Sequence, residues 1–194
     1  MLGDAAVPAT GAGSARLRLV AAGALAGLGA GLVAGVGARV AMRVVAVAAG
    51  RFPELSEATV IIVVLGGLLG VAPGIAFPAV RRFLPGAAAV RGALYGLMLF
   101  LALGLPALQR GSDPELSIGP PWLGRTLFAA LGPLYGLVLA GAQAWLERRL
   151  PPPRRGVLTI LGYGLLTVTV LVGVPLFAAF VADAVLGIEL PPLI

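Results

Sequence analysis

The sequence predicts an all-α integral membrane protein with five transmembrane helices, arranged as two parallel tandem helical hairpins followed by a fifth helix. Hydrophobic residues make up 59% of the 194 residues and charged residues only 11%, whereas soluble domains carry about a quarter charged residues. Five apolar runs are long enough to cross a hydrocarbon core of about 30 Å as helices. A short motif also recurs in two of the connections between these runs.

Each apolar run is bounded by charged residues and is expected to form one span. The runs cover residues of about 19–49, 58–80, 92–108, 126–146 and 156–182. The small and polar residues 1–15 predict a disordered cytoplasmic tail, which leaves a single transmembrane helical domain over 16–194. A cleaved signal peptide is the alternative for the start of the chain, but the apolar stretch continues far beyond the usual length of about 7 to 15 residues.

The distribution of arginine predicts the orientation of the spans. All 14 basic residues are arginine, and nine of them precede the first run or lie in the second-to-third and fourth-to-fifth connections. The other connections hold only Arg51, Arg110 and Arg125. Because cytoplasmic loops carry the excess of basic residues, we expect the N-terminus inside and the C-terminus outside. The absence of lysine, histidine, cysteine and asparagine is typical of a GC-rich bacterial genome, and thus indicates a bacterial cytoplasmic membrane.

An internal repeat supports the tandem hairpins. The segment FPELSEAT at 52–59 recurs as DPELSIGP at 113–120, and each copy leads into a span that ends on paired arginines, at 81–82 and 148–149. Both copies have the same predicted orientation, so the repeat is parallel. Parallel repeats occur in some transporters, but duplicated hairpins also form plain scaffolds, and both interpretations remain open.

Regularly spaced glycines predict close contacts between helices. They recur every four residues in the first, second and fourth spans: Gly23, Gly27, Gly31 and Gly35; Gly66, Gly70 and Gly74; Gly132 and Gly136. This glycine-zipper spacing lets helix backbones approach closely in lipid. We expect the first span to be the central or oligomerising helix, with membrane lipids and either a second copy or another membrane protein as partners.

Two arginines four residues apart, Arg39 and Arg43, lie near the predicted outer end of the first span. Glu54 follows this span by a short turn, and Asp183 reaches the same level at the end of the fifth. Three interpretations remain open for this group of four: arginines that snorkel to the headgroups, a structural ion pair with Glu54 or Asp183, and an anion or headgroup site. Arginine suits the last two because its planar fork binds a carboxylate or a phosphate at two points.

The segment ARVAMRVVA at 38–46, followed by PELSEATVII at 53–62, resembles a family of small, uncharacterised membrane proteins of high-GC bacteria. In that family an R-x-x-M-R pattern precedes a Pro-Glu turn and a second helix. The resemblance covers roughly residues 38–75 and implies that Arg39, Met42, Arg43, Pro53 and Glu54 are motif positions. It implies no activity.

The residue inventory argues against an enzyme. The chain has no histidine, cysteine or lysine, and its four serines lie outside the spans, so ordinary bases, thiol nucleophiles and soft metal ligands are missing. We assign no catalytic, cofactor-binding or metal-ligating residue and no nucleic-acid partner. The polar candidates within the spans are few: Tyr135, Gln143, Tyr163, Thr167 and Thr169. This favours a non-enzymatic packing or accessory subunit, with a small transporter or lipid-handling protein as the alternative.

Overall fold

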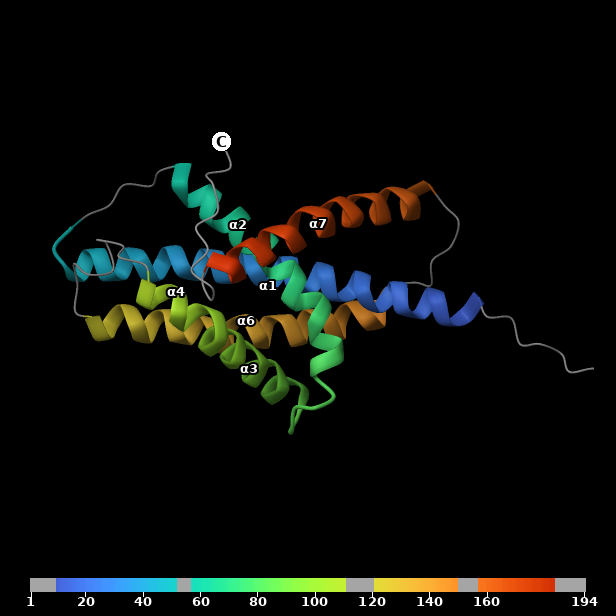
Figure 1. Cartoon of the computed structure of the whole chain (residues 1–194), viewed down its shortest axis with the longest axis horizontal. Helices are drawn as coiled ribbons and strands as arrows, with labels where there is room; N and C mark the ends of the chain where they lie inside the picture. The colour runs from blue at the N-terminus through green and yellow to red at the C-terminus, as the bar shows by residue number, and fades with distance from the viewer. Residues whose placement is uncertain (1–9, 52–56, 111–120, 150–156, 184–194) are drawn as a thin grey trace, which may run out of the picture.

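The computed structural model describes residues 10–51, 57–110, 121–149 and 157–183 (Figure 1). No strand occurs in this part of the chain, and the prediction of an all-helical fold is confirmed for it. Its helices are α1 (Thr10–Ala48), α2 (Glu57–Val80), α3 (Ala88–Leu99), the π-helical segment η1 (Phe100–Gly104), α4 (Leu105–Arg110), α6 (Pro121–Arg149) and α7 (Val157–Val181).

Four segments have the length and apolar composition of membrane-spanning helices. They are Arg18–Ala48, Thr59–Val80, Ala88–Gln109 and Trp122–Arg149. They match the first four predicted spans. The fifth predicted span corresponds to α7, in which side chains are described only from Leu166 onward, and this apolar part, Leu166–Val181, is shorter than the other four.

Successive helical segments run in opposite directions. The beginnings of α1, α3 and α7 and the ends of α2 and α6 all lie toward the right in Figure 1. We call this the arginine-rich end, because six described arginines of the predicted cytoplasmic side belong to these helix ends and the connections beside them: Arg18, Arg81, Arg82, Arg91, Arg148 and Arg149. The ends of α1, α4 and α7 and the beginnings of α2 and α6 lie toward the opposite end.

The first helix begins earlier than the sequence predicted. α1 starts at Thr10, so residues 10–15, which we expected in a disordered tail, are helical. Residues 1–9 lie outside the described part. The difference has a physical reason, because extending an existing helix costs much less than starting a new one. Residues 10–15 are alanine, glycine, serine and threonine, and nothing bulky or proline-like stops the long helix from extending through them.

The third span is not a uniform α-helix. Between α3 and α4 the five residues of η1 widen the turn, and the N–H of Leu105 donates to the carbonyl oxygen of Phe100, five residues back. Pro106 follows immediately and has no N–H to donate. A wider turn makes room for the proline ring and keeps the helix continuous. The continuous segment Ala88–Gln109 is longer at both ends than the run of 92–108 that the sequence predicted.

The two helices of the first hairpin approach each other through glycine. Three glycines on α1 face three on α2 in antiparallel order: Gly23 with Gly74, Gly27 with Gly70, and Gly31 with Gly66. A Cβ atom added at Gly23 would lie 2.6 Å from the carbonyl oxygen of Gly74, and one at Gly66 would lie 2.9 Å from that of Gly31. No larger side chain fits without moving a backbone, so these glycines set the distance between α1 and α2.

The second hairpin, formed by α3 and α6, has the same kind of contact. Gly92 and Gly96 of α3 meet Gly136 and Gly132 of α6, and a Cβ atom added at Gly132 would lie 2.8 Å from the Gly96 carbonyl oxygen. The sequence analysis identified the two glycines of α6 but not their partners on α3. α7 packs against α2, where a Cβ atom added at Gly173 would lie 2.7 Å from the carbonyl oxygen of Leu68.

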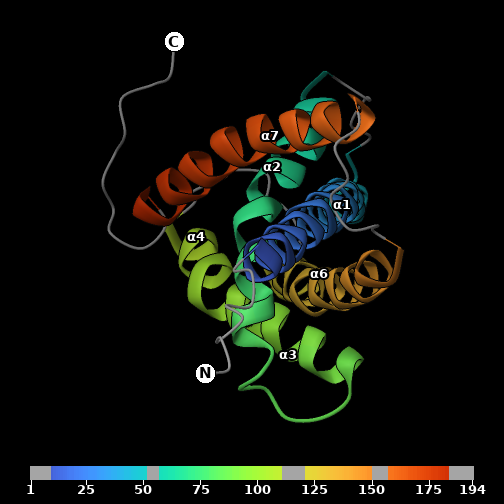
Figure 2. The same ribbon diagram turned by 90° about the vertical axis from the view of Figure 1, so that its right-hand side faces the viewer.

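α1 is the most buried of the four long helices. Figure 2 shows it between α2 and α6, with α7 lying across α2. Ala26 and Ala30 of α1 pack in one apolar cluster with Phe77 of α2 and with residues of α3 and α6: Tyr95, Tyr135, Leu139 and Ala140. This cluster joins the two hairpins, and the place of α1 in it agrees with a central first span.

Candidate functional site

Arg39 joins the end of α1 to the beginning of α2. Its side chain is half-buried, and its Nη2 donates a hydrogen bond to Oγ1 of Thr59 at 2.8 Å. Its Nη1 lies 3.9 Å from the sulfur of Met42, on the next turn of α1. Both of these partners are electrically neutral. Arg43, one turn beyond Arg39, is exposed.

The two predicted acidic partners are placed differently. Glu54 lies outside the described residues, and Asp183 is exposed just past the end of α7. Within the described part of the chain, Arg39 instead meets Thr59, a residue that the sequence analysis did not single out. An ion pair of Arg39 or Arg43 with Glu54 or Asp183 stays a prediction.

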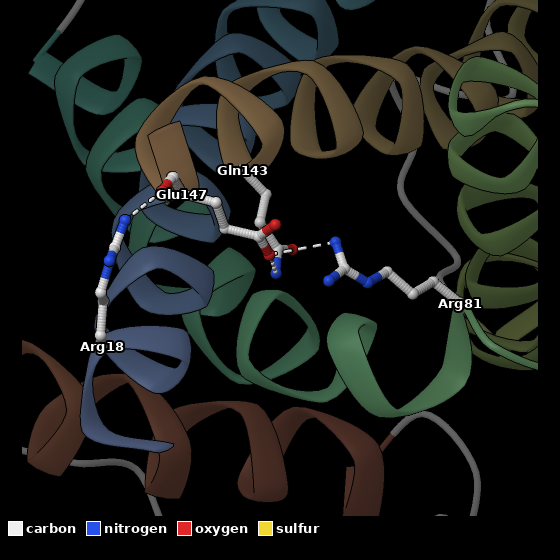
Figure 3. A network of polar contacts seen from close by, with 4 residues as sticks. All are labelled: Arg18, Arg81, Gln143 and Glu147. Carbon is white, nitrogen blue, oxygen red and sulfur yellow. Dashed lines mark hydrogen bonds and ion pairs between the residues drawn. The ribbon is translucent and has the colours of Figure 1, made fainter. Parts of the chain in front are cut away.

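A polar network that the sequence analysis missed lies at the arginine-rich end (Figure 3). Glu147, in the last turn of α6, is its centre. One carboxylate oxygen, Oε1, forms an ion pair with Nη1 of Arg81 at 3.0 Å and accepts a hydrogen bond from Nε2 of Gln143 at 2.9 Å. Arg81 follows the end of α2 directly, so the network ties the end of one hairpin to the end of the other.

Arg18 adds α1 to this network. Its Nη2 donates to the backbone carbonyl oxygen of Glu147. The last carbonyl groups of a helix have no partner within the helix and carry the negative end of its dipole. A guanidinium at this position therefore caps the end of α6 and stabilises the negative end of its dipole. Figure 3 shows Arg18, on α1, and Arg81, directly after α2, both approaching Glu147.

Gln143 is the most deeply buried member of the network. Its side chain is 0% exposed, and its amide group must donate toward the Glu147 carboxylate, which can only accept. Its own oxygen, Oε1, has no hydrogen-bond partner among the described residues. An unpartnered buried amide oxygen lowers the free energy of unfolding by about 1–3 kcal/mol. Gln143 therefore makes its hydrogen bond to Glu147 at that cost in stability.

One sequence signal for this network was present. Gln143 and Glu147 are four residues apart, which places them on the same face of a helix. Glu147 is also an acid directly before two arginines at the predicted cytoplasmic side. Which arginine it pairs with, however, depends on how the two hairpins are packed, and no local spacing contains that information.

Two buried tyrosines bind the backbone of α2. The hydroxyl of Tyr95, on α3, donates to the carbonyl oxygen of Pro73 at 2.8 Å. The hydroxyl of Tyr135, on α6, donates to the carbonyl oxygen of Gly70 at 2.9 Å. Pro73 has no N–H, so it leaves the carbonyl oxygen four residues earlier, that of Leu69, without its helical donor. The hydrogen bonds from the tyrosines go to two other carbonyl oxygens of this stretch of α2. Both tyrosine hydroxyls are thus used to hold α2 against the second hairpin.

The described residues contain no group of three or more acidic, histidine or cysteine side chains that could hold a metal ion. No protein-family model, curated protein or solved structure matches the chain. The resemblance to the family with the R-x-x-M-R pattern therefore stays a prediction.

Proposed function

We propose that this protein is a five-span integral protein of the bacterial cytoplasmic membrane, with its N-terminus inside, and that it acts without catalysis as a packing or accessory subunit. The exposed side chains support the membrane setting. On α2, for example, Val60, Ile61, Val64 and Leu65 are 39–65% exposed. Apolar surface of this kind is unfavourable in water and suited to lipid.

The observation that carries the accessory role is the use of the interior polar groups. A transporter of polar solutes needs polar groups that face its path at mid-depth. Here the hydroxyls of Tyr95 and Tyr135 are bound to the backbone of α2. These two buried hydroxyls therefore join helices and do not line a path.

The tandem hairpins belong to the same proposal. Each hairpin is closed by glycines that meet in antiparallel order, α1 with α2 and α3 with α6. The repeated PELS segments precede α2 and α6. Glycine contacts of the same kind, at corresponding positions in the two hairpins, support the descent of both hairpins from one repeated unit.

Purification from native membranes in a mild detergent tests the accessory role. The expected result is a second membrane protein that copurifies in fixed ratio and stays bound through gel filtration. A chain that always elutes alone, or only with copies of itself, contradicts the role.

The orientation has a separate test. Because the chain contains no cysteine, single cysteines at Ser14, Ser112 and Leu193 can be labelled in intact cells with a reagent that does not cross the membrane. Ser112 and Leu193 are expected to react, and Ser14 only after the cells are opened. Labelling of Ser14 but not of Ser112 contradicts the proposed orientation.

A further inference from the structure

An exposed apolar strip on α1 ends beside the arginine pair. Leu32, Val33, Val36 and Val40 are 37–58% exposed. At about 100° per residue, these four apolar side chains and the two arginines, Arg39 and Arg43, fall within an arc of about 120° around the helix. The glycines that contact α2 lie on another side of α1. The strip and the arginines therefore form one continuous surface that the rest of the described chain does not cover.

Arg39, on this surface, is held in position by two neutral groups. Arg39 is half-buried and fixed by a hydroxyl, Oγ1 of Thr59, and by the sulfur of Met42. These two groups are neutral, so they orient the guanidinium without adding an opposite charge to it. Arg43 follows four residues later, and like charges at this spacing destabilise a helix unless an anion lies between them. Two guanidinium groups one helical turn apart can bind the same phosphate.

We propose that Arg39, Arg43 and Thr59 bind the phosphate of a phospholipid whose acyl chain lies along Leu32, Val33 and Val36. The ligand has an anionic group at one end and an apolar chain at the other, and the surface has two cations at its outer end and exposed apolar side chains on the turns of α1 before them. The N–H groups in the first turn of α2, which begins at Glu57, lie at the same end and add the positive end of a helix dipole. This inference rests on the membrane setting proposed above.

A lipid titration of the purified full-length protein in mild detergent tests the site. Native mass spectrometry measures the apparent Kd for phosphatidylglycerol. In the double variant Arg39→Gln/Arg43→Gln we expect this Kd to rise about tenfold or more, because two charge-assisted contacts to the phosphate are lost. The control is Arg148→Gln/Arg149→Gln, which removes the same charge from exposed side chains at the arginine-rich end and should change the Kd by no more than about twofold, since exposed charges at a distance are screened.

Two further ligands distinguish the phospholipid from its parts. A diacylglycerol with the same chains lacks the phosphate and should bind the parent and the double variant equally weakly. Inorganic phosphate at millimolar concentration should not displace phosphatidylglycerol from the parent. Thr59→Val keeps both charges and removes the hydroxyl that orients Arg39, so it should raise the Kd even if the double variant folds poorly.

Several results would overturn the proposal. Equal Kd values for the parent and the double variant would show that the arginines do not bind the phosphate. An equal rise of the Kd in the control would indicate a general attraction between charges. Tight binding of diacylglycerol would indicate an apolar groove alone. Displacement of phosphatidylglycerol by inorganic phosphate would indicate a free-anion site. Failure of the membrane setting itself is distinguishable, because the chain would then leave the membrane fraction on cell fractionation.

Discussion

Replacing Gly27 by alanine is expected to force α1 and α2 apart. A Cβ atom at this position would lie 2.9 Å from the Cα of Gly74 and would also overlap the carbonyl oxygen of Gly70. Ordinary contact begins at 3.4 Å, so the first distance alone is 0.5 Å too short. Both neighbours are backbone atoms, which cannot rotate away as the end of a side chain can. The helices themselves must move.

Overpacking of this kind costs about 1–3 kcal/mol. For a chain of this size each kcal/mol lowers the melting temperature by about 2–4 °C. Gly27→Ala should therefore melt about 2–12 °C below the parent in detergent, as measured by circular dichroism or scanning fluorimetry. The control is Gly29→Ala on the same helix, where a Cβ atom meets nothing within 4 Å. Alanine is the better helix former by about 1 kcal/mol, so this control should melt at or above the parent. Equal melting temperatures for the two variants would refute the argument that backbone contact sets the helix distance.

Two further substitutions test the polar contacts between the hairpins. Glu147→Gln keeps the shape of the side chain but removes the charge that pairs with Arg81. We expect the free energy of unfolding to fall by about 1–3 kcal/mol, measured as a lower melting temperature. The control is Arg148→Gln, at an exposed neighbour, which should change the free energy of unfolding by less than about 0.5 kcal/mol. Tyr135→Phe keeps the ring and removes the hydroxyl that binds the Gly70 carbonyl, so it should cost about 1 kcal/mol, and a variant that melts like the parent would show that this bond contributes nothing.

The helices could be predicted from the sequence because one physical requirement determines them. A span must be apolar for about 20 residues and is bounded where charged residues return. The predicted run of 58–80 and the observed α2, Glu57–Val80, therefore differ by a single residue at one end. The prediction was less accurate where this requirement does not apply. The beginning of α1 depends on helix extension beyond the apolar run, and the third span contains a π-helical turn before Pro106.

The partners of the polar side chains could not be predicted in the same way. Arg39 was identified from its unusual place in an apolar run, but its contact with Thr59 depends on the antiparallel register of α1 and α2. Glu147 and Arg81 are far apart in the sequence and lie on different hairpins. The glycines of α3 were overlooked for a related reason. Two glycines four residues apart are common in a chain with 29 of them, and only the facing pair on α6 shows which ones make contact.

Glycines and polar side chains make different contacts in this fold. Within each hairpin the helices meet through glycine backbones. Four described polar contacts connect one hairpin to the other: Arg18 with Glu147, Arg81 with Glu147, Tyr95 with Pro73, and Tyr135 with Gly70. In the proposed membrane setting apolar side chains gain little by leaving lipid for one another, so shape can close a hairpin but does not select its neighbour. Hydrogen bonds and ion pairs depend on direction and distance, and they can make that selection. Substitutions of glycine should therefore disturb individual hairpins, whereas substitutions of Glu147 or Tyr135 should weaken the contact between two hairpins that each remain closed.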